Sequence, residues 1–157
     1  MGHHSKPFQD YAAALETKLA LLLACAPLSE SDLRDFDEVP GIYLFSEGDR
    51  HLYAGRTNNL KSRIQTHRRA GSKRNQAAFA YALAKAELGV AAVPYTKRHP
   101  EHPENLNGFE AAFCRAKDRV RSMRVRVVRE DDPIGQALLE IYVHLRLATP
   151  FNNFDNH

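Results

Sequence analysis

The sequence predicts an α/β fold of the α+β type, in which a small central three-stranded β-sheet is flanked by helices. Two β-rich runs, 41–45 and 51–55, are joined by a tight turn, which is typical of a hairpin. A third run, 123–127, alternates apolar and basic side chains, as expected of a strand with one buried face. Apolar residues at three- and four-residue steps elsewhere in the chain predict amphipathic helices.

The first element is a helix that precedes the hairpin. Apolar residues recur at helical spacing from Phe8 to Ala26, which predicts a helix with one face on a core. Ser31 and Asp32 offer a cap for a short second helix, which Pro40 ends. We interpret residues 1–39 as a structural, helical extension.

The helix after the hairpin carries much of the basic charge. Thr57, Asn58 and Asn59 offer its cap, and it ends near Gly71. Asp132 and Pro133 supply a cap and a first-turn proline for the last helix. The remaining predicted elements are a helix over 77–88, a proline-broken loop over 89–103, a helix over 109–120, the last helix through Leu147 and a polar tail over 149–154.

Length and charge limit the possible functions. The 157 residues are 43% hydrophobic and fit one domain, and no repeat or linker divides them. The formal net charge is +3, but residues 56–126 carry 16 basic and five acidic side chains. Residues 1–40 carry three basic and seven acidic ones. The basic middle of the chain favours a polyanionic partner without showing one.

Membrane and secreted classes are disfavoured. The longest apolar stretch, Leu19 to Pro27, is far shorter than the ~20 residues that span a bilayer, and no leader peptide is evident. Cys25 and Cys114 lie inside apolar helical patterns without a metal-ligand partner, so we expect both to be buried. These features predict a cytoplasmic protein with no membrane span.

A few polar residues stand out against this background. Tyr43 and Tyr53 are ten residues apart on paired strands, and Arg63 and His67 lie one helical turn apart. Glu140 is a lone carboxylate within an otherwise apolar helix. A carboxylate on a buried face is costly without a partner, so Glu140 requires a cation or a hydrogen-bond network.

At these residues the chain resembles the GIY-YIG nuclease superfamily. Gly41-Ile42-Tyr43 stands as the first motif and Tyr53-Ala54-Gly55 as the second, with alanine where the family commonly has isoleucine or valine. The resemblance implies that Arg63 is the catalytic arginine, that Glu140 is the metal-binding glutamate and that Asn152 is the closing asparagine of the family. It implies a single GIY-YIG-like domain over residues 1–157, with core motifs at 40–70 and 133–155 and an insertion plus the third strand at 71–132.

Two further features refine the resemblance. The arginine and histidine one turn apart are similar to an arrangement in some restriction enzymes of the superfamily. The C-terminal run 152–157 looks like a bacterial branch of small stand-alone members that includes site-specific single-stranded DNA nucleases.

The resemblance implies a metal-dependent DNA endonuclease that hydrolyses phosphodiester bonds. Glu140, as a single carboxylate ligand, suits Mg²⁺ or Mn²⁺. Arg63 offers a planar fork to the scissile phosphate. Tyr43 would hold or deprotonate the attacking water, and His67 could take the proton onward. The two other predicted site residues are Tyr53, which would position the phosphate or the water, and Asn152, which would fix the tail.

The expected partner is DNA, and the basic stretch supplies charge that neutralises phosphates. The strandedness, the cut site, the oligomeric state and the biological role stay open. Alternatives are a duplex-cutting, restriction-like enzyme, a non-catalytic nucleic-acid-binding module on the same fold, and a basic protein-interaction domain. The candidates for contacts to the nucleic-acid backbone are Arg56, Lys61, Arg68, Arg69, Lys73 and Arg74.

Overall fold

A computed structural model describes residues 6–90 and 102–154. Its contacts group into two compact units. The sheet unit runs up to Ile64 and resumes at Arg124, and the helical unit comprises Gln65–Met123. Helix α2 (Leu60–Arg68) begins in the first unit and ends in the second. The expectation of a single domain stays a prediction.

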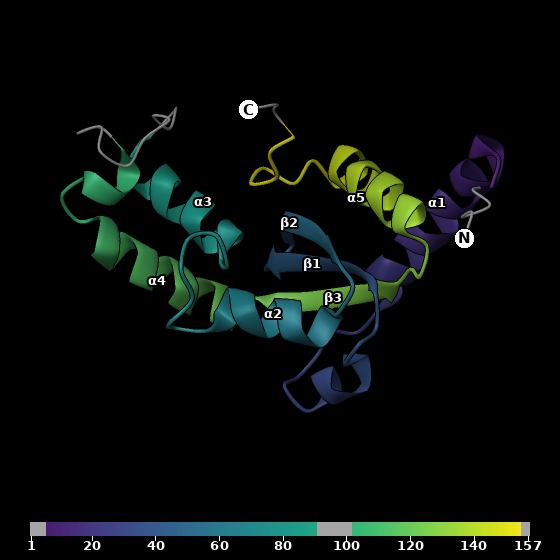
Figure 1. Ribbon diagram of the computed structural model, residues 1–157, viewed down its shortest axis with the longest axis horizontal. Coiled ribbons are helices and arrows are strands. Elements are labelled where there is room, and N and C mark those ends of the chain that lie inside the picture. The colour runs from purple at the N-terminus through teal and green to yellow at the C-terminus, as the bar shows by residue number, and fades with distance from the viewer. Residues whose placement is uncertain (1–5, 91–101, 155–157) are drawn as a thin grey trace, which may run out of the picture. The chain divides into compact units, whose positions relative to one another are not determined.

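The sheet unit contains the three predicted strands (Figure 1). They are β1 (Gly41–Glu47), β2 (Arg50–Thr57) and β3 (Arg124–Arg129), in the spatial order β2-β1-β3 with both pairs antiparallel. The predicted three-stranded α/β architecture is confirmed. Gly48, in the turn of the hairpin, has φ 58°, a left-handed conformation that glycine adopts readily. Strand β1 is central and almost wholly buried, whereas β2 lies at an edge.

Two helices cover one face of the sheet. Helices α1 (Phe8–Ala24) and α5 (Pro133–Leu147) lie side by side in Figure 1 and pack against the strands. Their apolar faces form a core with one face of the sheet, which accounts for the periodicity seen in the sequence. The buried residues of this core are Leu19, Leu22, Ile42, Leu44, Ala54, Val128, Leu139 and Val143.

Asp132 fixes the start of α5. Its side chain accepts hydrogen bonds from the backbone N–H groups of Ile134 and Gly135, as the predicted cap requires. The hydroxyl of Tyr11, on α1, donates to the same carboxylate at 2.8 Å. The cap therefore also joins the two helices that cover the sheet.

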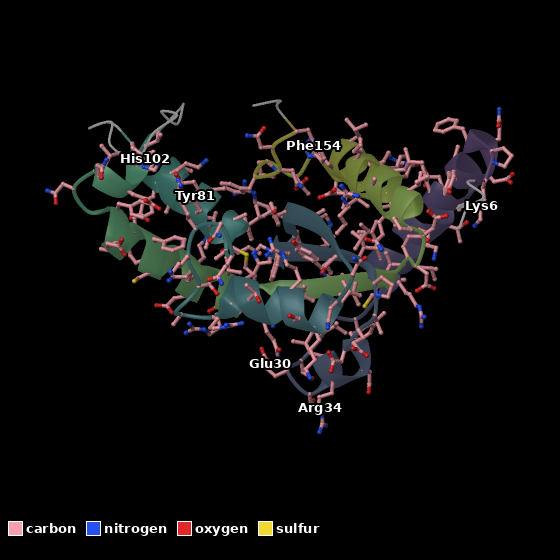
Figure 2. All side chains as sticks on the ribbon, in the orientation of Figure 1. Lys6, Glu30, Arg34, Tyr81, His102 and Phe154 are labelled. Atoms are coloured by element: carbon pink, nitrogen blue, oxygen red, sulfur yellow. The ribbon has the colours of Figure 1, made fainter. Side chains whose placement is uncertain are left out.

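The helical unit is built from α3 (Ala78–Glu87), the 3-10 helix η2 (Pro103–Asn105) and α4 (Phe109–Ser122). Helices α3 and α4 pack against each other, and Figure 2 labels Tyr81 on α3 and His102 before η2. The Tyr81 ring lies edge-on to Phe109 and Phe113, with centroids 5.9 and 6.4 Å away. This aromatic cluster forms the interior of the unit.

Some expectations need correction. Cys114 is exposed and Cys25 is half-buried, so the prediction that both are buried was wrong. The spacing of apolar residues locates the buried face of a helix only approximately, so a residue at its border can be exposed. The short second helix is a 3-10 helix, η1 (Asp32–Phe36). Most of the loop predicted over 89–103 lies outside the described residues. Among the described residues, no helix is long and apolar enough to cross a membrane.

Candidate active site

The glycines of the two strand motifs make room for their neighbours. Tyr43 on β1 is paired with Gly55 on β2, and a Cβ atom on Gly55 would lie 2.1 Å from the Tyr43 hydroxyl oxygen. A Cβ atom on Gly41 would lie 2.2 Å from the carbonyl oxygen of Val128 on β3. Gly55 thus lets the Tyr43 ring cross strand β2, and Gly41 lets β3 approach β1.

Tyr43 and Tyr53 lie together on the sheet. The Tyr43 side chain is 1% exposed, and its ring centroid is 6.3 Å from that of Tyr53 and 5.8 Å from that of Phe45. Burial raises the pKa of Tyr43 well above its ordinary value of 10.0, and the nearby Tyr53 raises it further. Burial also raises the pKa of Tyr53. Both phenols are therefore protonated at neutral pH and available as hydrogen-bond donors.

Helix α2 presents Arg63 to these hydroxyls. Leu60 and Ile64 are fully buried and anchor the helix. The Asn59 side chain caps it by accepting a hydrogen bond from the Ser62 N–H at 3.1 Å. Arg63 hydrogen-bonds the Tyr43 hydroxyl, and its charge lowers the pKa of both tyrosines against the effect of burial. A guanidinium and two phenols thus form one cluster.

Glu140 reaches the cluster from α5. Its carboxylate Oε2 lies 3.1 Å from Arg56 Nε, and the Glu140 side chain is 20% exposed. Burial raises the pKa of this carboxyl group, and Arg56 lowers it. The charge of Glu140 raises the pKa of Tyr43 and of Tyr53, so its electrostatic field reaches both hydroxyls. We expected a partly buried Glu140 to need a cation or a hydrogen-bond network, and the guanidinium of Arg56 is that cation.

The donor set fits a hard divalent cation. Among residues 6–90 and 102–154, no three His, Cys, Asp or Glu side chains gather at metal-binding distance. Glu140 itself offers one carboxylate, and a cation held there would take its further ligands from water or substrate oxygens. Mg²⁺ and Mn²⁺ accept such oxygen-rich, largely hydrated coordination, whereas Zn²⁺ favours several nitrogen or sulfur ligands.

Asn152 lies on the outer edge of β2. Its side-chain amide accepts a hydrogen bond from the Ala54 N–H at 2.9 Å and donates one to the Ala54 carbonyl at 2.6 Å. The Phe151 N–H donates to the Leu52 carbonyl at 3.2 Å. The C-terminal tail thus occupies the free edge of the strand that carries Tyr53, next to the candidate site.

His67 and Arg68 lie in the helical unit. His67 follows Arg63 by one turn of α2, and its ring is buried, so it is not a surface histidine. Arg68 is also buried and donates to the Met123 carbonyl at 2.9 Å. Because the Arg68 guanidinium is buried and bonded inside the helical unit, the prediction that Arg68 contacts the nucleic-acid backbone was wrong.

The other basic candidates differ in how they are engaged. Lys61 lies 3.6 Å from the Asp37 carboxylate in the sheet unit. Arg69 and Lys73 are exposed in the helical unit. There, Arg74 lies 3.1 Å from the Glu104 carboxylate. The structure thus gathers Tyr43, Tyr53, Arg63 and Glu140, with Arg56, in the sheet unit.

Sequence reasoning missed the pairing of Arg56 with Glu140. Arg56 appeared only as a candidate for DNA backbone contacts. The signal was available in the alternation of β2: Ala54 is buried under α5, and a residue two positions on faces the same way. An arginine there lies within reach of a carboxylate on α5.

Comparison with known proteins agrees with this geometry. The family model described as the GIY-YIG catalytic domain matches residues 39–143, a span that contains all three strands and Glu140. UvrABC system protein C from Deinococcus radiodurans is 43% identical over 42 residues, which are 27% of this chain and 7% of that protein. No solved structure gives a significant match. Because the family match spans well over half of the chain and includes both strand motifs, the chain belongs to the GIY-YIG family of nuclease catalytic domains.

Proposed function

We propose that this chain is a divalent-metal-dependent endonuclease that hydrolyses DNA phosphodiester bonds at a particular sequence or structure. The observation that carries the proposal is that the sheet unit brings together the Tyr43–Tyr53 ring pair, Arg63 on α2 and the carboxylate of Glu140 paired with Arg56. Phosphodiester hydrolysis requires an oriented water, a cation on the phosphate and stabilisation of the leaving oxygen. Two phenols, a guanidinium and a carboxylate that suits a metal meet these needs.

Arg63 would bind the scissile phosphate. Its planar fork can donate two parallel hydrogen bonds to phosphate oxygens, which lysine cannot do. The same guanidinium hydrogen-bonds the Tyr43 hydroxyl. The phosphate-binding group and the tyrosine are therefore held in a fixed relation before substrate arrives, which reduces the entropic cost of alignment.

Tyr43 would orient the attacking water as a neutral phenol. Because its raised pKa keeps the phenol protonated at neutral pH, Tyr43 holds the water by hydrogen bonds. It can take a proton from the water only when it passes its own proton to an acceptor. His67, one turn after Arg63 on α2, stays the acceptor that we propose from the sequence. Tyr53, whose hydroxyl also bonds that of Tyr43, would position the water or the phosphate.

Glu140 would hold the divalent cation. When bound, Mg²⁺ or Mn²⁺ neutralises negative charge that develops on the phosphate and on the leaving oxygen. Arg56 now occupies one oxygen of this carboxylate, and its side chain is 49% exposed. A DNA phosphate competes for the same guanidinium. Arg56 would therefore pass from Glu140 to the DNA backbone when substrate binds.

We place single-stranded DNA first as the substrate, because of the resemblance of the C-terminal run to that branch. Further contacts to the DNA backbone would use exposed or partly exposed basic residues of each unit, and Arg68 is left out because it is buried. The proposed residues are Arg56 and Lys61 on the sheet unit and, separately, Arg69, Lys73 and Arg74 on the helical unit.

The test is cleavage of labelled random-sequence DNA, single-stranded and duplex, with Mg²⁺ or Mn²⁺. Glu140→Gln and Arg63→Lys should each slow cleavage by about 10²–10³-fold, as loss of one charge-stabilising group does. Arg115→Gln is the control, because Arg115 is exposed and pairs with Glu87 on the surface of the helical unit. Cuts confined to duplex would favour a restriction-like enzyme. Salt-sensitive binding of both pools without cleavage would favour the binding module.

A further inference from the structure

The helical unit contains a buried cation without a counter-charge. Lys117 on α4 is 6% exposed. Its ammonium donates to the carbonyl oxygens of Ala70 and Ser72 and lies 4.4 Å from the centroid of the Phe113 ring. Within the described part of the chain, no carboxylate lies at ion-pair distance from it. Burying a charge in this way is costly unless an opposite charge is supplied.

Lys117 borders a cavity of about 470 Å³ that lies wholly within the helical unit. The loop Gly71–Asn75 forms one wall, and the side chains of Phe109 and Phe113 form an apolar wall with parallel rings 5.6 Å apart. A cavity of this size accommodates a ligand as large as a mononucleotide.

The charges around the cavity favour an anion. Lys73 is exposed at its border. Arg74 and Glu104 also line the cavity, and Arg74 Nε lies 3.1 Å from Glu104 Oε1. The charges of this pair therefore neutralise each other. Glu110, the second carboxylate of the lining, is exposed. Lys117 and Lys73 thus remain without a described carboxylate partner, next to an apolar wall.

We infer that this cavity binds a nucleotide, with its phosphate at Lys117 and Lys73 and its base or sugar against Phe109 and Phe113. A phosphate supplies the counter-charge that Lys117 lacks, and the apolar wall favours a ligand that also carries a base or sugar. The nucleotide is either free or part of a single strand. The second source rests on the proposed function, whereas the anion site itself does not.

The experiment measures ligand binding without metal, so that no cleavage is required. Titration calorimetry with dTMP, with a thymidine hexanucleotide and with inorganic phosphate compares wild type, Lys73→Gln and Lys117→Met. Lys73→Gln should weaken dTMP binding about fivefold and Lys117→Met about tenfold or more, as loss of a charge-assisted hydrogen bond does. Lys6→Gln is the control, because it removes one exposed lysine charge from the sheet unit and should leave binding unchanged.

The outcomes separate the possibilities. Equal binding of dTMP and hexanucleotide per site supports a free nucleotide as ligand, and a clear preference for the hexanucleotide supports a DNA strand. Phosphate binding as tight as that of dTMP would overturn the nucleotide assignment. Unchanged dTMP affinity in Lys73→Gln, or no binding to wild type, would overturn the site even if Lys117→Met fails to fold. Cleavage assays on the same proteins report separately on the proposed nuclease activity.

Discussion

Replacing Gly55 with alanine tests how closely the fold sets the position of Tyr43. The added Cβ would lie 2.1 Å from the Tyr43 hydroxyl oxygen, while ordinary contacts begin at 3.4 Å, so the phenol must move by about 1.3 Å. The ring is 1% exposed and lies against Phe45 and Tyr53, so it cannot move freely. We expect a loss of about 1–3 kcal/mol of stability from overpacking. A catalytic group displaced by about 1 Å should slow cleavage about 100-fold.

Gly48→Ala is the matched control. Gly48 has φ 58°, and a Cβ atom added there would have no atom within 4 Å beyond the adjoining residues of the chain, so alanine strains the hairpin turn without touching the tyrosine. We expect it to cost about 1 kcal/mol of stability and to leave the cleavage rate within about threefold of wild type. Thermal unfolding and single-turnover cleavage are measured on both variants. A folded Gly55→Ala protein that cleaves as fast as Gly48→Ala would refute the reasoning.

Three further predictions concern the tail, a helix cap and the ion pair. Asn152→Ala removes two hydrogen bonds to β2 and should lower the free energy of unfolding by about 1–3 kcal/mol in a denaturant titration; an unchanged midpoint would contradict this. Backbone hydrogen bonds hold the pKa of Asp132 below its ordinary 3.8, so its ionised form stabilises the fold above that pH and the stabilisation is lost as the pH falls through the folded pKa. Asp132→Ala should therefore lower the melting temperature at pH 7 more than at pH 2.5, and an equal loss at both would argue against the cap. Arg56→Gln should tighten Mn²⁺ binding about two- to fivefold without DNA, measured by electron paramagnetic resonance, because a partly exposed ion pair at Glu140 is removed; weaker binding would contradict the competition between Arg56 and the metal ion.

The strands and most helices follow from local sequence signals. The continuous β-rich run around Tyr43, the glycine of the turn and the cap at Asp132 each act within a few residues, so they can be recognised without the rest of the chain. The same holds for Asn59, whose side chain caps α2. Because the Asn59 cap fixes where α2 begins, it also fixes which turn of the helix carries Arg63.

The contacts that define the cluster are long-range and could not be obtained from spacing alone. The Arg56–Glu140 pair joins a strand to the last helix, and the bonds of Asn152 to β2 join residues 98 positions apart. Lys117 is a further example, because lysine on a helix is ordinarily exposed. Its ammonium is buried because two loop carbonyls, at Ala70 and Ser72, accept its hydrogen bonds.

Cys114 shows where periodicity misleads. It lies within an apolar-looking helix, but the buried side of α4 is defined by Phe109, Phe113 and Ala116, and Cys114 falls outside it. One residue of rotation on a helix is about 100°, which is enough to move a side chain from the core to the surface.

The most direct test of the central claim is single-turnover hydrolysis of a 5′-labelled single-stranded DNA pool by wild type and by Glu140→Gln, with Mg²⁺, at matched DNA occupancy. The account predicts discrete wild-type products with 3′-hydroxyl ends, cleavage slowed about 10³-fold in Glu140→Gln, and DNA affinity within about threefold of wild type. Equal cleavage by the two proteins would contradict the role of Glu140. No cleavage of single-stranded or duplex DNA by wild type would contradict the nuclease activity itself.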